Sequence, residues 1–149
     1  VLTPDDRYAY VSCFISDEVR VIDTAANNVI AAVKVGKRPF LLEVTPDGQF
    51  VYVANQGSNN VSVIRVVDNQ VVTTIESRSF ANPHGIAFTP NGRYAYVTNE
   101  NLDGSFEAHH PIEQGGNPGN VQVIDTATFA VIKTIEVEVD PTGIVVVER

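Results

Sequence analysis

Short apolar stretches, each closed by turn residues, follow one another along almost the whole chain. Residues 86–89 and 94–98 are rich in β-branched and aromatic side chains, and Pro90, Asn91 and Gly92 between them are typical of a tight turn. No segment shows an apolar period of 3.6 residues over a useful length, so helix is not expected. The pattern therefore predicts an all-β fold.

The same unit recurs along the chain. Its turn is found three times, offset by 42 and then 44 residues, as Thr3-Pro4-Asp5-Asp6, Thr45-Pro46-Asp47-Gly48 and Thr89-Pro90-Asn91-Gly92. Four short strands, which we label A to D in order, fit each repeat, and repeats of this length are typical of the four-stranded antiparallel blades of a β-propeller. We predict one partial propeller domain over residues 1–149, with blades at about 1–35 plus 143–147, at 41–75 and at 86–135.

Three blades do not close a ring, because propellers usually have four to eight. One hypothesis is a homodimer that completes a six-bladed ring, in which each chain's last strand, at 144–147, completes the partner's first blade. The other is a fragment of a larger propeller, which the absence of methionine favours.

One blade carries a recognisable signature. Tyr96-Val97-Thr98-Asn99 resembles the signature of the YVTN family of β-propeller repeats, and residues 52–55 and 10–13 are variants of it. The resemblance covers nearly the whole chain outside residues 100–119. It implies a prokaryotic surface-layer or secreted protein with an extracytoplasmic location, and related propellers accompany periplasmic redox enzymes.

Composition narrows the classes of partner. The formal net charge of −8 argues against nucleic acid, whose phosphates need clustered cations. No apolar run is long enough to predict a membrane span. A single cysteine, Cys13, excludes an internal disulfide framework and is expected to be a half-buried small residue.

The third repeat contains a long insertion, at residues 100–119. Asn99 and Val121 are separated by 21 residues, whereas Asn55 and Val61 are separated by five. A connection of that length inside a compact repeat is usually functional or disordered. Antiparallel alternation places the B–C and D–A connections at one end of each blade, so the three histidines are expected near one mouth of the central channel.

These residues suggest two kinds of metal site beside the plain alternative of ordinary turns. A transition metal could be held by histidines with nearby carboxylates such as Asp103, Glu107 or Glu113, although adjacent histidines rarely point the same way. Calcium could be held by the cluster of Asn99, Asn101, Asp103 and Gly104, although this stretch lacks the leading Asp and the closing Glu of a calcium loop. The candidate metal ligands are Asn99, Asn101, Asp103, Glu107, His84, His109 and His110.

Other chemistry has little support in the sequence. There is no nucleophile elbow, phosphate loop or CxxC motif. Lys37 and Arg38 could receive an anion at the channel mouth, or simply be solvated. Asp23, Asp68 and Asp125 are expected to cap hairpin turns, and Tyr10, Tyr52 and Tyr96 to pack between blades.

The sequence thus favours a non-catalytic binding or structural propeller module that contacts a protein or small ligand through one loop face, with no cofactor required. The candidate residues on this face are Lys37, Arg38, His84, His109 and His110. The alternative is a propeller subunit of a periplasmic oxidoreductase, or a metal-dependent enzyme, with its site at the channel mouth.

Overall fold

The computed structural model describes residues 1–107 and 115–147, and these form three antiparallel sheets with no helix. We call the sheets blades 1, 2 and 3. Blade 1 is β1 (Tyr8–Cys13), β2 (Glu18–Asp23) and β3 (Asn28–Lys34). Blade 2 is β4 (Pro39–Val44), β5 (Phe50–Asn55), β6 (Asn60–Arg65) and β7 (Gln70–Glu76). Blade 3 is β8 (Pro83–Phe88), β9 (Tyr94–Asn99), β10 (Pro118–Asp125) and β11 (Ala130–Val139).

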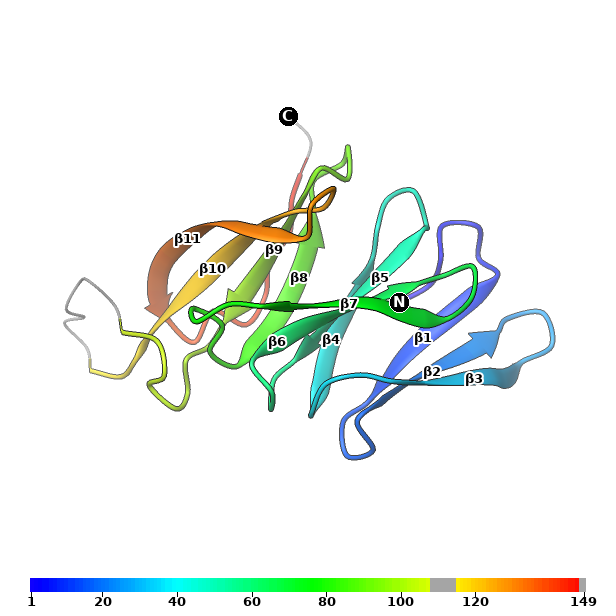
Figure 1. Cartoon of the computed structure of the whole chain (residues 1–149), viewed down its shortest axis with the longest axis horizontal. Helices are drawn as coiled ribbons and strands as arrows, with labels where there is room; N and C mark the ends of the chain where they lie inside the picture. Colours follow the sequence, from blue (N-terminus) through cyan, green and yellow to red (C-terminus); the bar gives the residue numbers. More distant parts are fainter. Residues whose placement is uncertain (108–114, 148–149) are drawn as a thin grey trace.

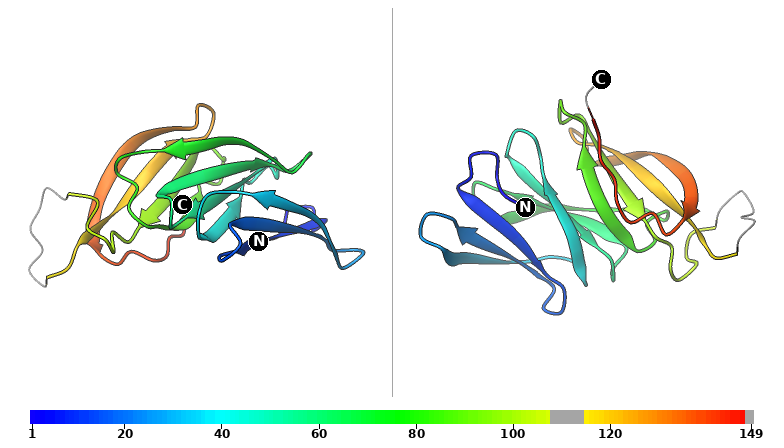
Figure 2. Two further views of the ribbon diagram at one scale, coloured as in Figure 1. Left: turned by 60° about the horizontal axis from the view of Figure 1, so that its bottom comes forward. Right: turned by 180° about the vertical axis from the view of Figure 1, so that it is seen from behind.

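Within each blade, strands that follow one another in the sequence are also neighbours in the sheet. The blades lie side by side in an arc, as the views from the front and from behind show (Figures 1 and 2). This is the blade arrangement of a β-propeller, so the predictions of an all-β fold and of three blades are confirmed.

Hydrophobic side chains fill the seams between the blades. One cluster joins blades 1 and 2 and includes Tyr10, Val21 and Val53, while a second joins blades 2 and 3 and includes Tyr52 and Phe88. Tyr10 and Tyr52 are each only 1% exposed, which confirms for these two residues the prediction that the recurring tyrosine packs between blades.

The repeated turns are built alike. The Thr45 hydroxyl donates to Asp47 Oδ1 at 2.6 Å, and the Gly48 N–H donates to the Thr45 carbonyl at 2.8 Å. Gly48 has a φ of +71°, a conformation that costs glycine little because it has no Cβ. Asp23 and Asp125 accept backbone N–H groups in the other hairpin turns, as the sequence predicts.

Two strand predictions need correction. β10 begins at Pro118, so the last two residues of the predicted insertion belong to a strand. Residues 144–147 are not a strand in the structure of the single chain. They run beside β8, where the His84 ring nitrogen Nδ1 lies 2.7 Å from the Thr142 carbonyl (Figure 2).

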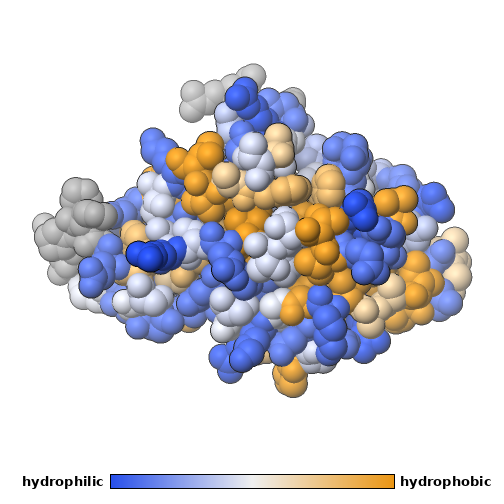
Figure 3. All heavy atoms as spheres, viewed as in Figure 1, coloured by the Kyte–Doolittle hydropathy of each residue, from blue (hydrophilic) through white to orange (hydrophobic). Residues whose placement is uncertain are grey.

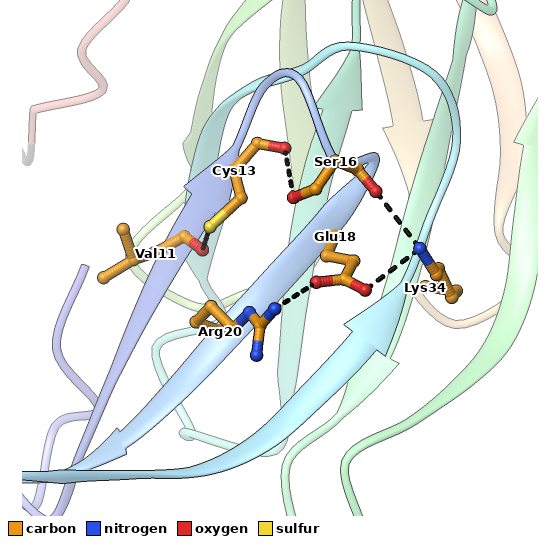
Figure 4. Close-up of polar contacts among 6 residues, drawn as sticks. All are labelled: Val11, Cys13, Ser16, Glu18, Arg20 and Lys34. Carbon is orange, nitrogen blue, oxygen red and sulfur yellow. Dashed lines mark hydrogen bonds and ion pairs between the residues drawn. The ribbon is translucent and has the colours of Figure 1, made fainter.

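Blade 1 has a charged cluster on β2 and β3 (Figure 4). Glu18 forms ion pairs with Arg20 at 2.7 Å and with Lys34 at 2.9 Å, and Lys34 Nζ also donates to the Ser16 carbonyl. The hydrogen bond from Lys34, together with the two positive charges, holds the pKa of Glu18 below its ordinary value. Cys13 lies at the end of β1, half-buried as expected, with its thiol near the Val11 carbonyl.

Hydrophobic residues also reach the surface, in a band across the middle of the face that Figure 3 shows. Exposed examples on the strands include Val11, Val72 and Ile132. Within residues 1–107 and 115–147, no helix is long and apolar enough to cross a membrane.

Candidate functional site: the loop face

The connections between strands gather at two opposite ends of the blades. We call one end the loop face: it carries residues 14–17, 56–59, 100–107 and 115–117 and the links between blades at 35–38 and 77–82. We call the other end the turn face: it carries the Thr-Pro-Asx turns and the hairpin turns at 24–27, 66–69 and 126–129.

At the loop face, neighbouring blades are joined by hydrogen bonds of the same kind, from a backbone N–H to a side-chain oxygen. We call each of these contacts a clasp. The Arg38 N–H donates to Asp17 Oδ1 of blade 1, and the Asn82 N–H donates to Asn59 Oδ1 of blade 2, both at 2.8 Å. All four residues have φ between 51° and 57°. The prediction that the B–C connections, which carry Asp17 and Asn59, and the D–A connections, which carry Arg38 and Asn82, lie on one face is therefore confirmed.

We call the seam between blades 1 and 2 the first seam, and the one between blades 2 and 3 the second seam. At the first seam, the hydrogen-bonded Arg38 and its neighbour Lys37 lie beside exposed apolar residues. The Arg38 guanidinium carbon lies 5.4 Å from the centre of the Phe14 ring, and Ile15 is 95% exposed. A shallow cavity of about 470 Å³ lies between these residues. A Cβ at Gly57 would come within 2.8 Å of Arg38 Cδ, so glycine leaves room for the arginine stem.

His84 lies at the start of β8, among groups from three segments. Its ring is 4.3 Å from that of Phe40, and its Nε2 is 3.5 Å from Glu100 Oε1. Glu100 is 8% exposed, and its other oxygen accepts a hydrogen bond from Gln56 Nε2 at 2.9 Å. A buried carboxylate thus stands between an imidazole and an amide.

One partner of His84 fixes the hydrogen on one of its ring nitrogens. The Thr142 carbonyl, 2.7 Å from Nδ1, can only accept, so Nδ1 carries a hydrogen. The other ring nitrogen, Nε2, faces the Glu100 carboxylate, so His84 and Glu100 form an imidazole–carboxylate pair.

Asn99 and Asn101 have structural roles. The Asn99 side chain accepts from the Ala81 N–H and donates to Asn120 Oδ1, and it is fully buried. Asn101 is 1% exposed, and its amide donates to the carbonyls of Phe106 and Pro118. Both amides brace the first part of the insertion from inside and do not form an open ligand set.

The other candidate ligands are more dispersed. Asp103 Oδ1 accepts the Ser105 N–H at 3.0 Å, and hydrogen bonds from Ser105 hold the pKa of Asp103 below its ordinary value. Glu107 is exposed. Among the residues that the structure describes, no three His, Cys, Asp or Glu side chains form a group that could hold a metal. His109, His110 and Glu113 lie outside the described residues.

Sequence reasoning found His84, Lys37 and Arg38 but missed Glu100 and Phe14. Both missed residues follow the Asn or Cys that ends the second strand of a repeat, where blade 2 has Gln56. This position holds Phe14, Gln56 and Glu100 in the three repeats, so a comparison of the repeats at this position could have identified both missed residues.

Comparison with known proteins agrees with this fold. A model described as "Lactonase, 7-bladed beta-propeller" matches residues 1–85, and the chain belongs to this family. A search of curated proteins finds no match.

Two solved structures are similar. One is a chain of Kuenenia stuttgartiensis hydrazine synthase, with 27% identity, a TM-score of 0.79 and coverage of 92% of this chain. The other, a structure of U3-55K, has 13% identity and a TM-score of 0.75 over 94% of this chain, and it bears on the fold alone. This chain spans 36% of the hydrazine synthase chain and 39% of the U3-55K chain.

Proposed function

We propose that the chain is a binding module that contacts a protein or small ligand through its loop face. The observation that carries the proposal is the clasped arrangement of Lys37 and Arg38 beside Phe14 and Ile15. Arginine and aromatic side chains dominate binding energy at protein interfaces, and a fixed backbone lowers the entropic cost of association. The two cations favour a partner that presents a carboxylate next to apolar groups.

The experiment is quantitative affinity capture from an extract of the source cells, with matched variants. Ile15→Asp and Arg38→Gln change the loop face, and Val67→Asp changes a valine on the turn face that is 86% exposed, against 95% for Ile15. We expect the loop-face variants to lose a specific partner that the wild type and the Val67 variant retain. Equal capture by all four proteins would overturn the proposal.

The second candidate function is enzymatic, with the site at the channel mouth. It is supported by the His84–Glu100 pair, by the lactonase description of the family and by the similarity to a hydrazine synthase chain. Such a pair could act as a general base on water in lactone hydrolysis, or it could serve a propeller subunit of an oxidoreductase.

A pH-stat assay with a δ-lactone separates the two candidates. If the pair is catalytic, Glu100→Gln should lower the hydrolysis rate by roughly 10²–10⁴-fold, while Glu43→Gln, on β4 away from the pair, should leave it unchanged. A rate no faster than buffer for the wild type would leave the binding function as the better account.

The insertion prompts a metal proposal. His84, with His109 and His110, could hold a transition metal, and the Asn/Asp cluster could hold calcium. Elemental analysis of the purified protein, compared with a His109→Ala/His110→Ala variant, tests this. A metal-free wild type after dialysis against micromolar zinc and calcium would contradict it.

We also propose that the three blades belong to a larger ring. The family description specifies seven blades, which paired three-blade arcs do not give, so the match favours this alternative over a six-bladed homodimer. Light scattering distinguishes them, because the homodimer requires twice the chain mass of 16.2 kDa. An extracytoplasmic location rests on the YVTN resemblance, and fractionation of the source cells would test it.

A further inference from the structure

The turn face contains a cavity between blades 2 and 3 that the proposed loop-face function does not use. It has a volume of about 540 Å³. It is lined by residues of two Thr-Pro-Asx turns, by the aromatic residues Phe50 and Tyr52, and by Arg93.

Tyr52, one of the lining residues, carries an unsatisfied polar group. Its hydroxyl is buried and has no hydrogen-bond partner, although the residue is only 1% exposed. A buried hydroxyl without a partner is unfavourable by about 1–3 kcal/mol. At the equivalent place between blades 1 and 2, the Tyr10 hydroxyl donates to Asn69 Oδ1 at 2.6 Å. The second seam therefore lacks a hydrogen bond that the first seam has.

Phe129 explains the missing bond. It occupies the position of Asn27 and Asn69 in the other hairpin turns and shares their positive φ, here 57°. Asparagine tolerates this conformation, whereas for a bulky side chain it is unusual and strained. The Phe129 ring lies 6.1 Å from Phe50 and 6.4 Å from Tyr52, so an aromatic group replaces the amide that would have capped Tyr52.

The charges around the cavity are mixed. The Arg93 guanidinium lies over the Tyr94 ring at 5.1 Å, and no carboxylate in the described part of the chain forms an ion pair with it. Asp47 also lines the cavity. Burial, and then the charges of Asp125 and Asp47, raise the pKa of Tyr52. The phenol and the guanidinium can donate hydrogen bonds, and the Asp47 carboxylate can accept them.

We propose that this cavity binds a neutral monosaccharide ring. A sugar supplies an acceptor oxygen for the Tyr52 hydroxyl and for Arg93, and it offers hydroxyl donors to the Asp47 carboxylate. Its apolar ring face suits the aromatic side chains that line the cavity. The charge of Asp47 disfavours an anionic ligand. The proposal is independent of the loop-face function.

The test is an NMR titration of the ¹⁵N-labelled chain with D-glucose, D-galactose and D-mannose, and with gluconate as the charged comparison. At least one neutral sugar should give saturable shifts at residues 45–52 and 90–94. Tyr52→Phe should weaken that binding about tenfold, the loss of one hydrogen bond. Tyr10→Phe, the same change at the first seam, should leave the affinity unaltered.

A second variant protects the test against misfolding. Phe129→Asn introduces at the second seam an asparagine equivalent to Asn69, which accepts the hydrogen bond of Tyr10 at the first seam. The new amide should accept a hydrogen bond from the Tyr52 hydroxyl and so abolish the sugar shifts. The proposal is overturned if none of the three sugars gives saturable shifts. It is also overturned if gluconate alone binds, or if Tyr52→Phe and Phe129→Asn bind as the wild type does.

Discussion

The two seams between blades are alike at one end and different at the other. At the loop face, Asp17 clasps Arg38 and Asn59 clasps Asn82 with hydrogen bonds of the same length. At the turn face, the first seam closes with a bond between Tyr10 and Asn69, while the second seam leaves Tyr52 unpaired.

The difference shows which parts of the repeat hold the fold and which parts are free to change. The clasp recurs because each blade needs a fixed angle to its neighbour, and a backbone N–H bonded to a side-chain oxygen supplies it. The turn-face position tolerates either Asn or Phe because the hydrophobic seam already joins the blades. A change that costs stability at such a position points toward a ligand site.

The largest effect on stability should come from removing the Tyr52 side chain from the second seam. Tyr52→Ala leaves a cavity against Phe88, whose ring centre is 5.0 Å away, and should lower the free energy of unfolding by about 3–5 kcal/mol. Urea unfolding measures it. Val67→Ala, on an exposed turn, is the control and should change stability by less than about 0.5 kcal/mol. A loss at Tyr52 as small as that would mean that the seam is not packed as described.

The clasps should give the next largest effect, and an equal one. Asp17→Ala and Asn59→Ala each leave a backbone N–H without its acceptor, and each should cost about 0.5–1.5 kcal/mol. Unfolding of the two variants and of the double variant should show additive losses, because the sites lie in different seams. One clasp with no measurable effect would break the equivalence of the two seams at the loop face.

Blade 1 should respond to acid more than blade 2 does. Glu18 pairs with Arg20 and Lys34, where blade 2 has Asn60, Ser62 and Glu76. The folded pKa of Glu18 is lowered from 4.5, so its stabilisation is present above that pH and is lost as the pH falls through the lowered value.

Glu18→Gln should therefore destabilise at pH 7 and have no effect at pH 2, and salt should reduce the difference. Unfolding curves at the two pH values measure it. An equal loss at both would mean that the side chain acts through packing rather than charge.

Much of the fold could be predicted from the sequence, because its signals are local. Alternating apolar residues and Thr-Pro-Asx turns recur with a blade's period, which predicted three blades. The start of β10 was missed because Gly115, Gly116, Pro118 and Gly119 are typical of a loop. It becomes a strand through its pairing with β9 and β11, which local sequence does not encode.

The candidate site was less predictable, because its contacts join segments distant in sequence. Topology placed His84 on the loop face, but its partner Glu100 is positioned by a backbone hydrogen bond to the Asn82 carbonyl, in a segment distant in sequence. The unpaired Tyr52 depends on residue 129 of the next blade, so no local pattern around Tyr52 distinguishes it from Tyr10.

The most direct test of the comparison is to measure urea unfolding of Tyr10→Phe and Tyr52→Phe in parallel. Each variant removes one hydroxyl and nothing else. The account predicts a loss of about 1 kcal/mol for Tyr10→Phe, which leaves Asn69 without its donor, and no loss or a small gain for Tyr52→Phe. Equal losses would show that the Tyr52 hydroxyl has a protein partner, and the distinction between the two seams would fail.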